Sequence, residues 1–280
     1  MPSPVIDAVQ DHIALESAIG GYEAEARKEA AIERTYSACA RLVGGKVDEI
    51  ALVENATRAW DMAFYALAAG FGAGDRILTA ETEYASNVIA YLQVTQRTGV
   101  AIEPAPNDAD GALDVDGALD VDALAAMIDE RVKLIAVTHV PTNGGLVNPA
   151  AEIGSVARAA GIPHLLDACQ LAGQISLDVG AIGCDVLTAT GRKYLRGPRG
   201  TGFLWVRRDL VEKLEPPFLD LHAAEWTCRD RYTVRADAKR FETWEGNVAA
   251  KIGLGVAVDY ALDWGIDAIE ERIGALADRL

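Results

Sequence analysis

The sequence predicts an α/β fold in which a mostly parallel sheet is covered by helices on both faces. Along the middle of the chain, short β-rich runs alternate with helical runs, which is the pattern of successive βαβ units. The chain has 280 residues and 50% of them are hydrophobic, so it is long enough to bury a large core around such a sheet. We therefore predict one large α/β domain, either alone or with a small appendage.

The alternation begins with a predicted strand at Glu49–Val53. A helix is predicted next at Thr57–Ala69, because apolar residues such as Ala59, Met62 and Ala63 recur there at helical spacing. The same alternation then repeats along the chain. The further predicted elements are, in order, strand Arg76–Ala80, helix Ser86–Arg97, strand Lys133–His139, helix Pro149–Ala160, and strands His164–Asp167, Asp185–Thr190 and Gly202–Arg207.

The pattern changes after the pair Pro216-Pro217. Residues 218–245 are rich in charged and aromatic side chains, and we predict that they form mainly loops. Two helices are expected at Asn247–Trp264 and Ile266–Leu280, with Gly265 as the break between them. A tandem repeat of six residues, at 110–115 and 116–121, is interpreted as a duplication in a surface loop before a helix that starts near Val121.

The composition argues against several classes of function. A net charge of −16 argues against a general role in binding nucleic acid or membrane surfaces. The first residues do not resemble a secretory signal, and no apolar run is long enough for a transmembrane helix. The four cysteines are far apart and lack metal-ligand spacing, so we expect reduced thiols, no metal site and a cytoplasmic location (Cys39, Cys169, Cys184, Cys228).

The strongest candidate for chemistry is Lys193. It lies in a short loop rich in glycine and arginine between two predicted strands. A lysine amine beside a phosphate-binding loop can hold an aldehyde cofactor as a Schiff base. The alternative is an ordinary solvated basic loop.

Other candidate groups follow predicted strands, and the carboxyl ends of parallel strands share one edge of a sheet. Asp167 ends a strand, where its carboxylate can pair with a protonated pyridine nitrogen or simply cap a turn. Gln170 can donate a hydrogen bond to a phenolate oxygen. Ala56 and Thr57 open a helix, so their N–H groups suit a phosphate, although an ordinary helix cap explains the same residues.

Three further side chains complete the predicted site. Thr190 and Arg192 can supply a hydroxyl and a guanidinium group to the same phosphate. Tyr84 follows another strand and can stack on an aromatic cofactor or pack on the core.

Taken together, these motifs resemble the class V aminotransferase (cysteine desulfurase-like) family of fold-type I pyridoxal-phosphate enzymes. The resemblance extends from Pro4 to the C-terminus and is nearest to the branch of C–S lyases and isopenicillin-N-epimerase-like proteins. It implies a seven-stranded sheet, a homodimer and pyridoxal 5'-phosphate as the cofactor. The motifs that carry it are Glu54-Asn55-Ala56-Thr57, residues 138–145, Asp167-Ala168-Cys169-Gln170, Thr190-Gly191-Arg192-Lys193 and residues 240–245.

The resemblance also implies roles for individual residues. Lys193 is expected to form the internal aldimine and to move the substrate's α-proton. Asp167 is expected to pair with the pyridinium nitrogen, and Gln170 with the phenolic oxygen. Tyr84 stands where desulfurases carry a histidine that stacks on the ring, and Thr142 where they often carry an asparagine. The phosphate ligands are expected to be Ala56, Thr57, Thr190 and Arg192.

The implied activity is cleavage of a carbon–sulfur bond in an amino acid by a pyridoxal-phosphate enzyme. An amino-acid epimerase and an aminotransferase remain alternatives on the same scaffold. The chain also looks truncated at both ends relative to the family, so a homologue that binds the cofactor without turnover is a further alternative. We expect an N-terminal helical segment at 1–45, a cofactor-binding domain at 46–245, and linking helices with the start of a small domain at 246–280.

Overall fold

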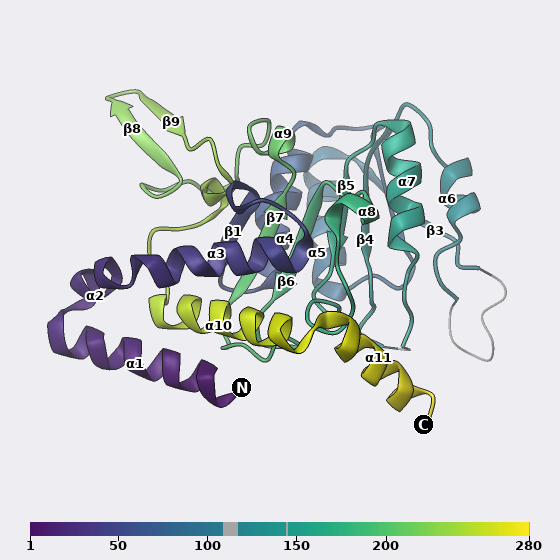
Figure 1. The fold of residues 1–280 in the computed structure, drawn as a ribbon. Coiled ribbons are helices and arrows are strands. Elements are labelled where there is room, and N and C mark those ends of the chain that lie inside the picture. Colours follow the sequence, from purple (N-terminus) through teal and green to yellow (C-terminus); the bar gives the residue numbers. More distant parts are fainter. Residues whose placement is uncertain (109–116, 144, 280) are drawn as a thin grey trace.

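The computed structural model describes residues 1–108, 117–143 and 145–279. The first copy of the tandem repeat lies outside the described residues. A seven-stranded sheet, in the order β1-β7-β6-β5-β4-β2-β3, forms the centre of the fold (Figure 1). Strand β7 runs antiparallel to both of its neighbours, and the other neighbouring pairs are parallel, so the predicted mostly parallel α/β sheet is confirmed. The strands are β1 (Ile50–Val53), β2 (Arg76–Ala80), β3 (Ala101–Ala105), β4 (Val132–Thr138), β5 (His164–Asp167), β6 (Val186–Thr190) and β7 (Gly202–Val206).

Helices cover both faces of this sheet, as expected (Figure 1). Successive strand residues point to opposite faces. Ile50 and Leu52 of β1 therefore pack in one hydrophobic cluster with α3 (Glu29–Val43) and α10 (Val248–Trp264). Ala51 and Val53 pack in another with α4 (Ala56–Leu67) and α5 (Ala85–Thr98). The other helices are α1 (Ser3–Ile19), α2 (Gly21–Arg27), α6 (Val121–Ala126), α7 (Ala150–Ala160), α8 (Val179–Ile182), α9 (Arg208–Val211) and α11 (Ile266–Ala277), with short 3-10 turns at η1 (Val47–Glu49), η2 (Ala68–Gly70) and η3 (Ala238–Phe241).

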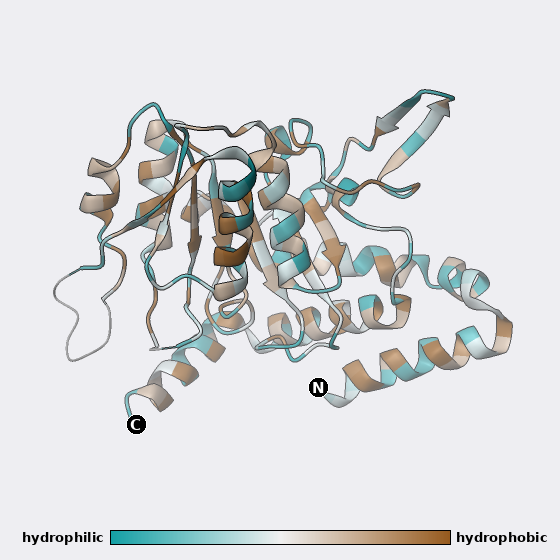
Figure 2. Cartoon of the chain, turned by 180° about the vertical axis from the view of Figure 1, so that it is seen from behind, coloured by the Kyte–Doolittle hydropathy of each residue, from teal (hydrophilic) through white to brown (hydrophobic). Residues whose placement is uncertain are grey.

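Helix α10 lies between helix α1 and the core of the sheet. Figure 2 shows hydrophobic residues along the central strands, and α10 contributes Leu254 and Val258 to that core. Helix α1 packs against α10. The buried carboxylate of Asp259 in α10 accepts a hydrogen bond of 2.6 Å from Arg34 and a second from Arg41, both on α3. Gly265, with φ +84°, separates α10 from α11, which confirms the predicted break.

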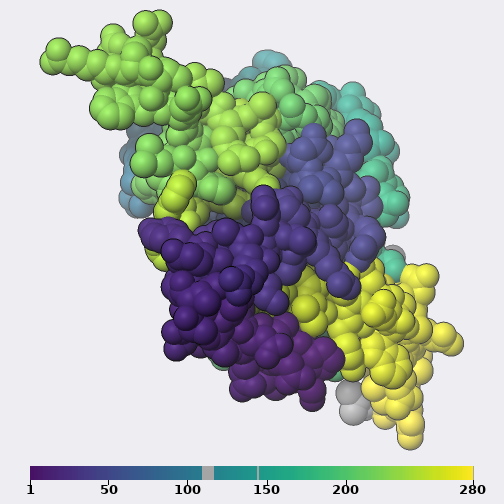
Figure 3. All heavy atoms as spheres, turned by 60° about the vertical axis from the view of Figure 1, so that its left-hand side comes forward, coloured from purple at the N-terminus to yellow at the C-terminus, as the bar shows by residue number. Residues whose placement is uncertain are grey.

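Two parts of the sheet architecture differ from the sequence prediction. Strand β3 was not predicted, and it holds Pro104 at the edge of the sheet, a position where a residue without an N–H group is tolerated. The prediction of loops for residues 218–245 was wrong for a hairpin of β8 (Ala224–Cys228) and β9 (Arg231–Val234). Figure 3 shows this hairpin projecting from the body of the molecule. Its strands are exposed on both faces, so they lack the alternation of apolar and polar residues that marks a half-buried strand.

The remaining predicted elements are present, with ends that differ by a few residues at most. Strands β2 and β5 have the predicted bounds, and α6 starts at Val121. All four cysteines are free. In the described part of the chain, no helix is long and apolar enough to cross a membrane. The division of the chain into three segments stays a prediction.

His164 gives the fold an expected sensitivity to acid. It is fully buried in β5, its ring nitrogens lack hydrogen-bond partners among the described residues, and burial lowers its pKa from 6.5 to about 3. Between these two values the unfolded chain binds a proton that the folded chain does not, so folding stability falls as the pH falls from 6.5 toward 3. Burial also lowers the pKa of the neighbouring His139, to about 4.

We expect the His164→Leu variant to lose part of this pH dependence. One titrating histidine contributes a slope of about 1.4 kcal/mol per pH unit to the free energy of unfolding. Urea denaturation of cofactor-free protein at several pH values between those limits measures the slope. The slope of the variant should be smaller than that of the wild-type protein by up to this amount, and equal slopes would show that His164 is not the titrating group.

Candidate active site

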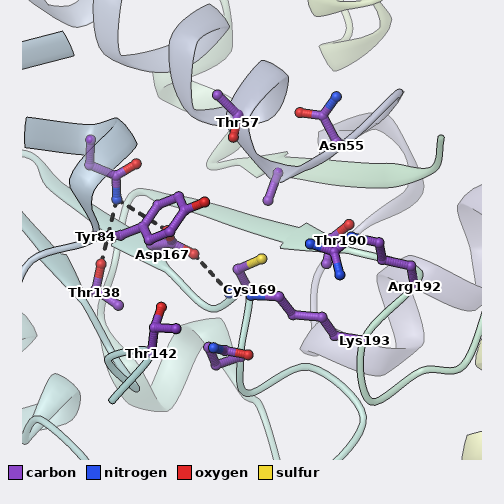
Figure 4. Close-up of a pocket in the computed structure, with 13 residues that line it drawn as sticks. Asn55, Thr57, Tyr84, Thr138, Thr142, Asp167, Cys169, Thr190, Arg192 and Lys193 are labelled. Carbon is purple, nitrogen blue, oxygen red and sulfur yellow. Dashed lines mark hydrogen bonds between the residues drawn. The ribbon is translucent and has the colours of Figure 1, made fainter. Parts of the chain in front are cut away.

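The carboxyl ends of β1, β2, β4, β5 and β6 meet at one edge of the sheet, and a pocket of about 400 Å³ lies there. This volume is within the range of about 300–1,000 Å³ that is typical of small-molecule sites. All nine side chains predicted to form the site line this pocket (Figure 4). The complete lining is Asn55, Ala56, Thr57, Tyr84, Asn87, Thr138, Thr142, Asp167, Cys169, Gln170, Thr190, Arg192 and Lys193.

Lys193 is presented to the pocket by a tightly closed loop between β6 and β7. The Gly191 N–H donates to the Thr201 carbonyl at 2.9 Å, and the Gly197 N–H donates to the Gly191 carbonyl at 2.7 Å. A Cβ atom at position 191 would lie 2.3 Å from the Thr201 hydroxyl oxygen and 2.8 Å from Leu254 Cδ1, so a larger residue there would force these buried side chains to move. Within the described residues, no carboxylate forms an ion pair with Lys193. Lys193 therefore has no carboxylate partner there, and its side chain hydrogen-bonds the Cys169 thiol at the pocket.

Asp167 places a buried carboxylate on the same pocket at the end of β5. Its Oδ1 atom accepts a hydrogen bond of 2.8 Å from the Cys169 N–H, and its Oδ2 atom accepts one of 3.1 Å from the Asn87 amide. Burial raises the pKa of Asp167, while these hydrogen bonds and the charge of Lys193 act in the opposite direction. Each carboxylate oxygen keeps a lone pair for a ligand. Asp167 is therefore suited to bind a protonated ring nitrogen.

The first turn of α4 presents backbone N–H groups to one edge of the pocket. Asn55 caps this helix, because its Oδ1 atom accepts a hydrogen bond of 2.9 Å from the Arg58 N–H. The N–H groups of Ala56 and Thr57 have no acceptor within the helix, and the helix dipole makes this end partly positive. A Cβ atom at Gly202 would come within 2.9 Å of the Asn55 backbone, so a glycine in β7 lets the two segments approach.

The side chain of Thr190 is already engaged. Its hydroxyl donates to the Thr201 carbonyl at 3.1 Å, and it must turn before it can donate to a phosphate. A phosphate oxygen only accepts hydrogen bonds at neutral pH, and the backbone N–H groups at the start of α4 and the guanidinium of Arg192, which also lines the pocket, are donors that could bind it. The predicted role of Thr190 as a phosphate ligand stays a prediction.

The remaining predicted residues also lie at the pocket. Tyr84 precedes α5 and is 39% exposed. Gln170 also lines the pocket, and its backbone carbonyl accepts a hydrogen bond from the Gln174 side chain. Thr142 contributes from the segment after β4. Burial raises the pKa of the Cys169 thiol to about 11, and the charge of Asp167 adds to this shift while Lys193 opposes it.

Asn87 is a pocket residue to which the sequence prediction assigned no role. It lies in the first turn of α5, one helical turn after Glu83, and contacts Asp167 from 80 positions away in the sequence. A local signal exists, because two polar residues spaced by four directly follow a buried strand. That signal does not identify the partner, which is brought close only when β2, β4 and β5 are neighbours in the sheet.

The donor set fits pyridoxal phosphate. An amine lies where an aldehyde can be held, a buried carboxylate can pair with the ring nitrogen, and a helix N-terminus with an arginine can bind the phosphate. In the described part of the chain, no group of histidine, cysteine or acidic residues is arranged to hold a metal ion. Fold and pocket together define the fold-type I class of pyridoxal-phosphate proteins.

Comparison with known proteins identifies the family. The family model described as Aminotransferase class-V matches residues 1–280, and the chain belongs to this family. A probable cysteine desulfurase of Xylella fastidiosa (strain 9a5c) is 37% identical over 244 residues, which cover 86% of this chain and 57% of that protein. A probable cysteine desulfurase of Methanothermobacter thermautotrophicus is 30% identical over 274 residues, or 97% of this chain and 66% of the relative. The chain thus spans about 57% to 66% of the length of these curated relatives.

Solved structures share the fold over the whole chain. The apo structure of a cysteine desulfurase from Thermococcus onnurineus NA1 has a TM-score of 0.90 and 26% identity, and the match covers 100% of this chain and 69% of that one. A C-DES variant, solved with glycine covalently linked to its pyridoxal-phosphate cofactor, has a TM-score of 0.86 at 23% identity, with 100% and 72% covered. Because the C-DES variant is only 23% identical to this chain, the similarity to it shows a shared fold and nothing about function.

Proposed function

We propose that this protein is a pyridoxal-phosphate enzyme that cleaves a carbon–sulfur bond of an amino acid. The observation that carries the proposal is that Lys193 and the buried Asp167 line one pocket with an anion-binding helix end. The cysteine desulfurase relatives support the choice of a sulfur-containing substrate. When bound, the cofactor supplies an electron sink for the negative charge that develops at the α-carbon of an amino acid.

Each role in this proposal falls to a residue of the pocket. The Lys193 amine would hold the cofactor's aldehyde carbon, and the same amine is placed at the pocket to take the substrate's α-proton. Asp167 keeps the ring nitrogen protonated, because a buried carboxylate there favours the positive charge. Arg192 and the first turn of α4 hold the phosphate, and Tyr84 covers the ring at the mouth of the pocket.

The state of Cys169 favours elimination over sulfur transfer to the enzyme. Among the described residues that line the pocket it is the single cysteine, and a pKa of about 11 keeps it a neutral thiol, which is a weak nucleophile at neutral pH. In elimination the α-proton and the sulfur group leave, and the remaining three-carbon product takes up water to give pyruvate and ammonia. With L-cysteine the sulfur leaves as hydrogen sulfide, so no enzyme thiol is consumed.

Product analysis tests this proposal. The full chain, supplied with pyridoxal phosphate and L-cysteine or L-cystine, should release pyruvate and ammonia in equal amounts. Cys169→Ala should change the rate by less than about tenfold, which corresponds to about 1.4 kcal/mol in the barrier. Lys193→Ala serves as the inactive control.

Other products would contradict the proposal in distinct ways. Alanine without pyruvate, together with inactivity of Cys169→Ala, would indicate a desulfurase that uses this thiol. A D-amino acid would indicate an epimerase, and a keto acid that keeps its sulfur would indicate an aminotransferase. Binding of the cofactor without any of these products would indicate a homologue that binds without turnover.

We also propose that the protein works as a homodimer in the cytoplasm. Exposed apolar side chains on α5, beside Tyr84 and the pocket, support a contact with a second copy, since Ile89 is 66% and Leu92 is 52% exposed. The four free cysteines agree with a reducing compartment.

A further inference from the structure

One side-chain amide links two buried carboxylates beside the pocket. The Nδ2 atom of Asn87 lies 3.1 Å from Asp167 Oδ2 and 3.1 Å from Glu83 Oε1. Asn87 is 1% exposed and Asp167 is 4% exposed. An amide nitrogen carries two hydrogens, so each carboxylate can receive one of them.

The two carboxylates differ in their capacity to bind a ligand. Asp167 receives hydrogen bonds from two protein donors, as described above. Six protein donors lie within hydrogen-bond distance of Glu83, which is more than the roughly four acceptor positions of a carboxylate. Glu83 is therefore saturated by protein and has no room for a ligand. Its donors are Thr79 Oγ1, the Tyr84 N–H, Asn87 Nδ2, Tyr91 Oη, the Thr138 N–H and Thr138 Oγ1.

These donors come from three elements, β2, α5 and β4, and from the turn before α5. Glu83 consequently ties the start of α5 to the two strands beneath it. Burial raises the pKa of Glu83, hydrogen bonds from Thr138, Tyr84 and Asn87 oppose this shift, and the nearby charge of Asp167 adds to it. Such an arrangement is costly in free energy unless both carboxylates are well supplied with donors.

The orientation of the Asn87 amide follows from its neighbours. If the amide were turned over, its oxygen would face two carboxylate oxygens and both contacts would become repulsive. The Glu83 contact therefore selects the orientation in which Asn87 donates to Asp167. With the Cys169 N–H on Oδ1 and Asn87 on Oδ2, both oxygens of Asp167 are held in place (Figure 4).

We propose that Asn87 and Glu83 are positioning residues for the ring nitrogen of the cofactor. Glu83 orients the Asn87 amide, Asn87 holds the Asp167 carboxylate toward the ring, and the charge of Glu83 adds to the negative potential at that nitrogen. This inference rests on the proposed binding of pyridoxal phosphate. It goes beyond that proposal by assigning two residues that act through Asp167.

Two ligands separate positioning of Asp167 from a general structural effect. One is pyridoxal phosphate, and the other is its 1-deaza analogue, in which a CH group replaces the ring nitrogen. We expect Asn87→Leu to raise the dissociation constant of pyridoxal phosphate about tenfold, which is about 1.4 kcal/mol, and to leave that of the analogue within about twofold. Glu83→Gln should show the same selective loss. Gln93→Ala, an exposed change on the same helix, is the matched control and should bind both ligands like the wild-type protein.

The outcomes are distinguishable. If the wild-type protein binds neither ligand, the proposed function fails before this inference is tested. If the wild-type protein binds both and Asn87→Leu weakens them equally, or weakens neither, the positioning role is wrong. Asn87→Ala, which adds no volume, replaces Asn87→Leu if the larger side chain prevents folding, and the circular dichroism spectrum and retained binding of the analogue show that a variant is folded.

Discussion

Lys193→Ala should remove the visible absorption of the cofactor-loaded protein and abolish turnover. The wild-type protein, supplied with pyridoxal phosphate, should show a band at ~420 nm that reports the covalent link between the lysine amine and the cofactor's aldehyde carbon. Alanine has no amine to make that link or to move the α-proton. Loss of a general base alone lowers rates by roughly 10²–10⁴-fold. The remaining activity should therefore fall below detection.

Chemical trapping locates the link. Reduction of the loaded wild-type protein with borohydride, followed by digestion and mass spectrometry, should place the pyridoxyl group on the peptide that contains Lys193. Lys213→Ala is a matched control, because this exposed lysine is not part of the pocket lining, and its variant should keep both band and label. A wild-type protein that stays colourless with added cofactor would refute the cofactor proposal. A label on another lysine would refute the role of Lys193 but not the cofactor proposal.

Asp167→Asn should weaken cofactor binding or turnover but leave the stability of the folded chain almost unchanged. A neutral amide cannot stabilise a protonated ring nitrogen, and a hydrogen bond to a charged group contributes about 1.5–3 kcal/mol, so binding or turnover should fall about 10- to 150-fold. Because burial raises the pKa of Asp167, its ionised form is disfavoured in the folded chain above the unfolded pKa, and this cost disappears in the variant. The new NH2 group faces one of the two donors that the carboxylate had accepted from, and this loss offsets the relief. The free energy of unfolding of cofactor-free Asp167→Asn should therefore stay within about 1 kcal/mol of the wild-type value.

Parallel measurements of cofactor affinity, turnover and urea denaturation check this expectation. Asp209→Asn, at an exposed aspartate after β7, is the control and should change none of them. A large loss of stability together with unchanged affinity would mean that Asp167 is a structural residue. We expect the opposite result, in which cofactor affinity or turnover falls and the free energy of unfolding changes little. This is the pattern of a binding site that keeps a buried charge at a cost in stability.

The parts of the fold that the sequence predicted well are those with a strong local signal. Strand β5 is an apolar run that closes on a carboxylate, and α10 follows the cap Asn247, whose side chain accepts a hydrogen bond of 2.9 Å from the Ala250 N–H. Strand β3 was missed because it is short, lies at the edge and contains Pro104. The β8–β9 hairpin was missed because neither of its faces is buried, so burial imposed no alternation on its residues.

The sequence by itself determined which chemical groups follow which strands, and the family motifs named Lys193, Asp167 and the other site residues. Strand ends and helix starts depend on residues that are neighbours along the chain, so pattern and spacing are enough to predict them. The tertiary structure decided the order of the strands, and with it the contact of Asn87 with Asp167 and the engagement of the Thr190 hydroxyl by the Thr201 carbonyl. Such contacts join segments that meet only when the sheet has assembled and its core has packed, which local periodicity does not encode.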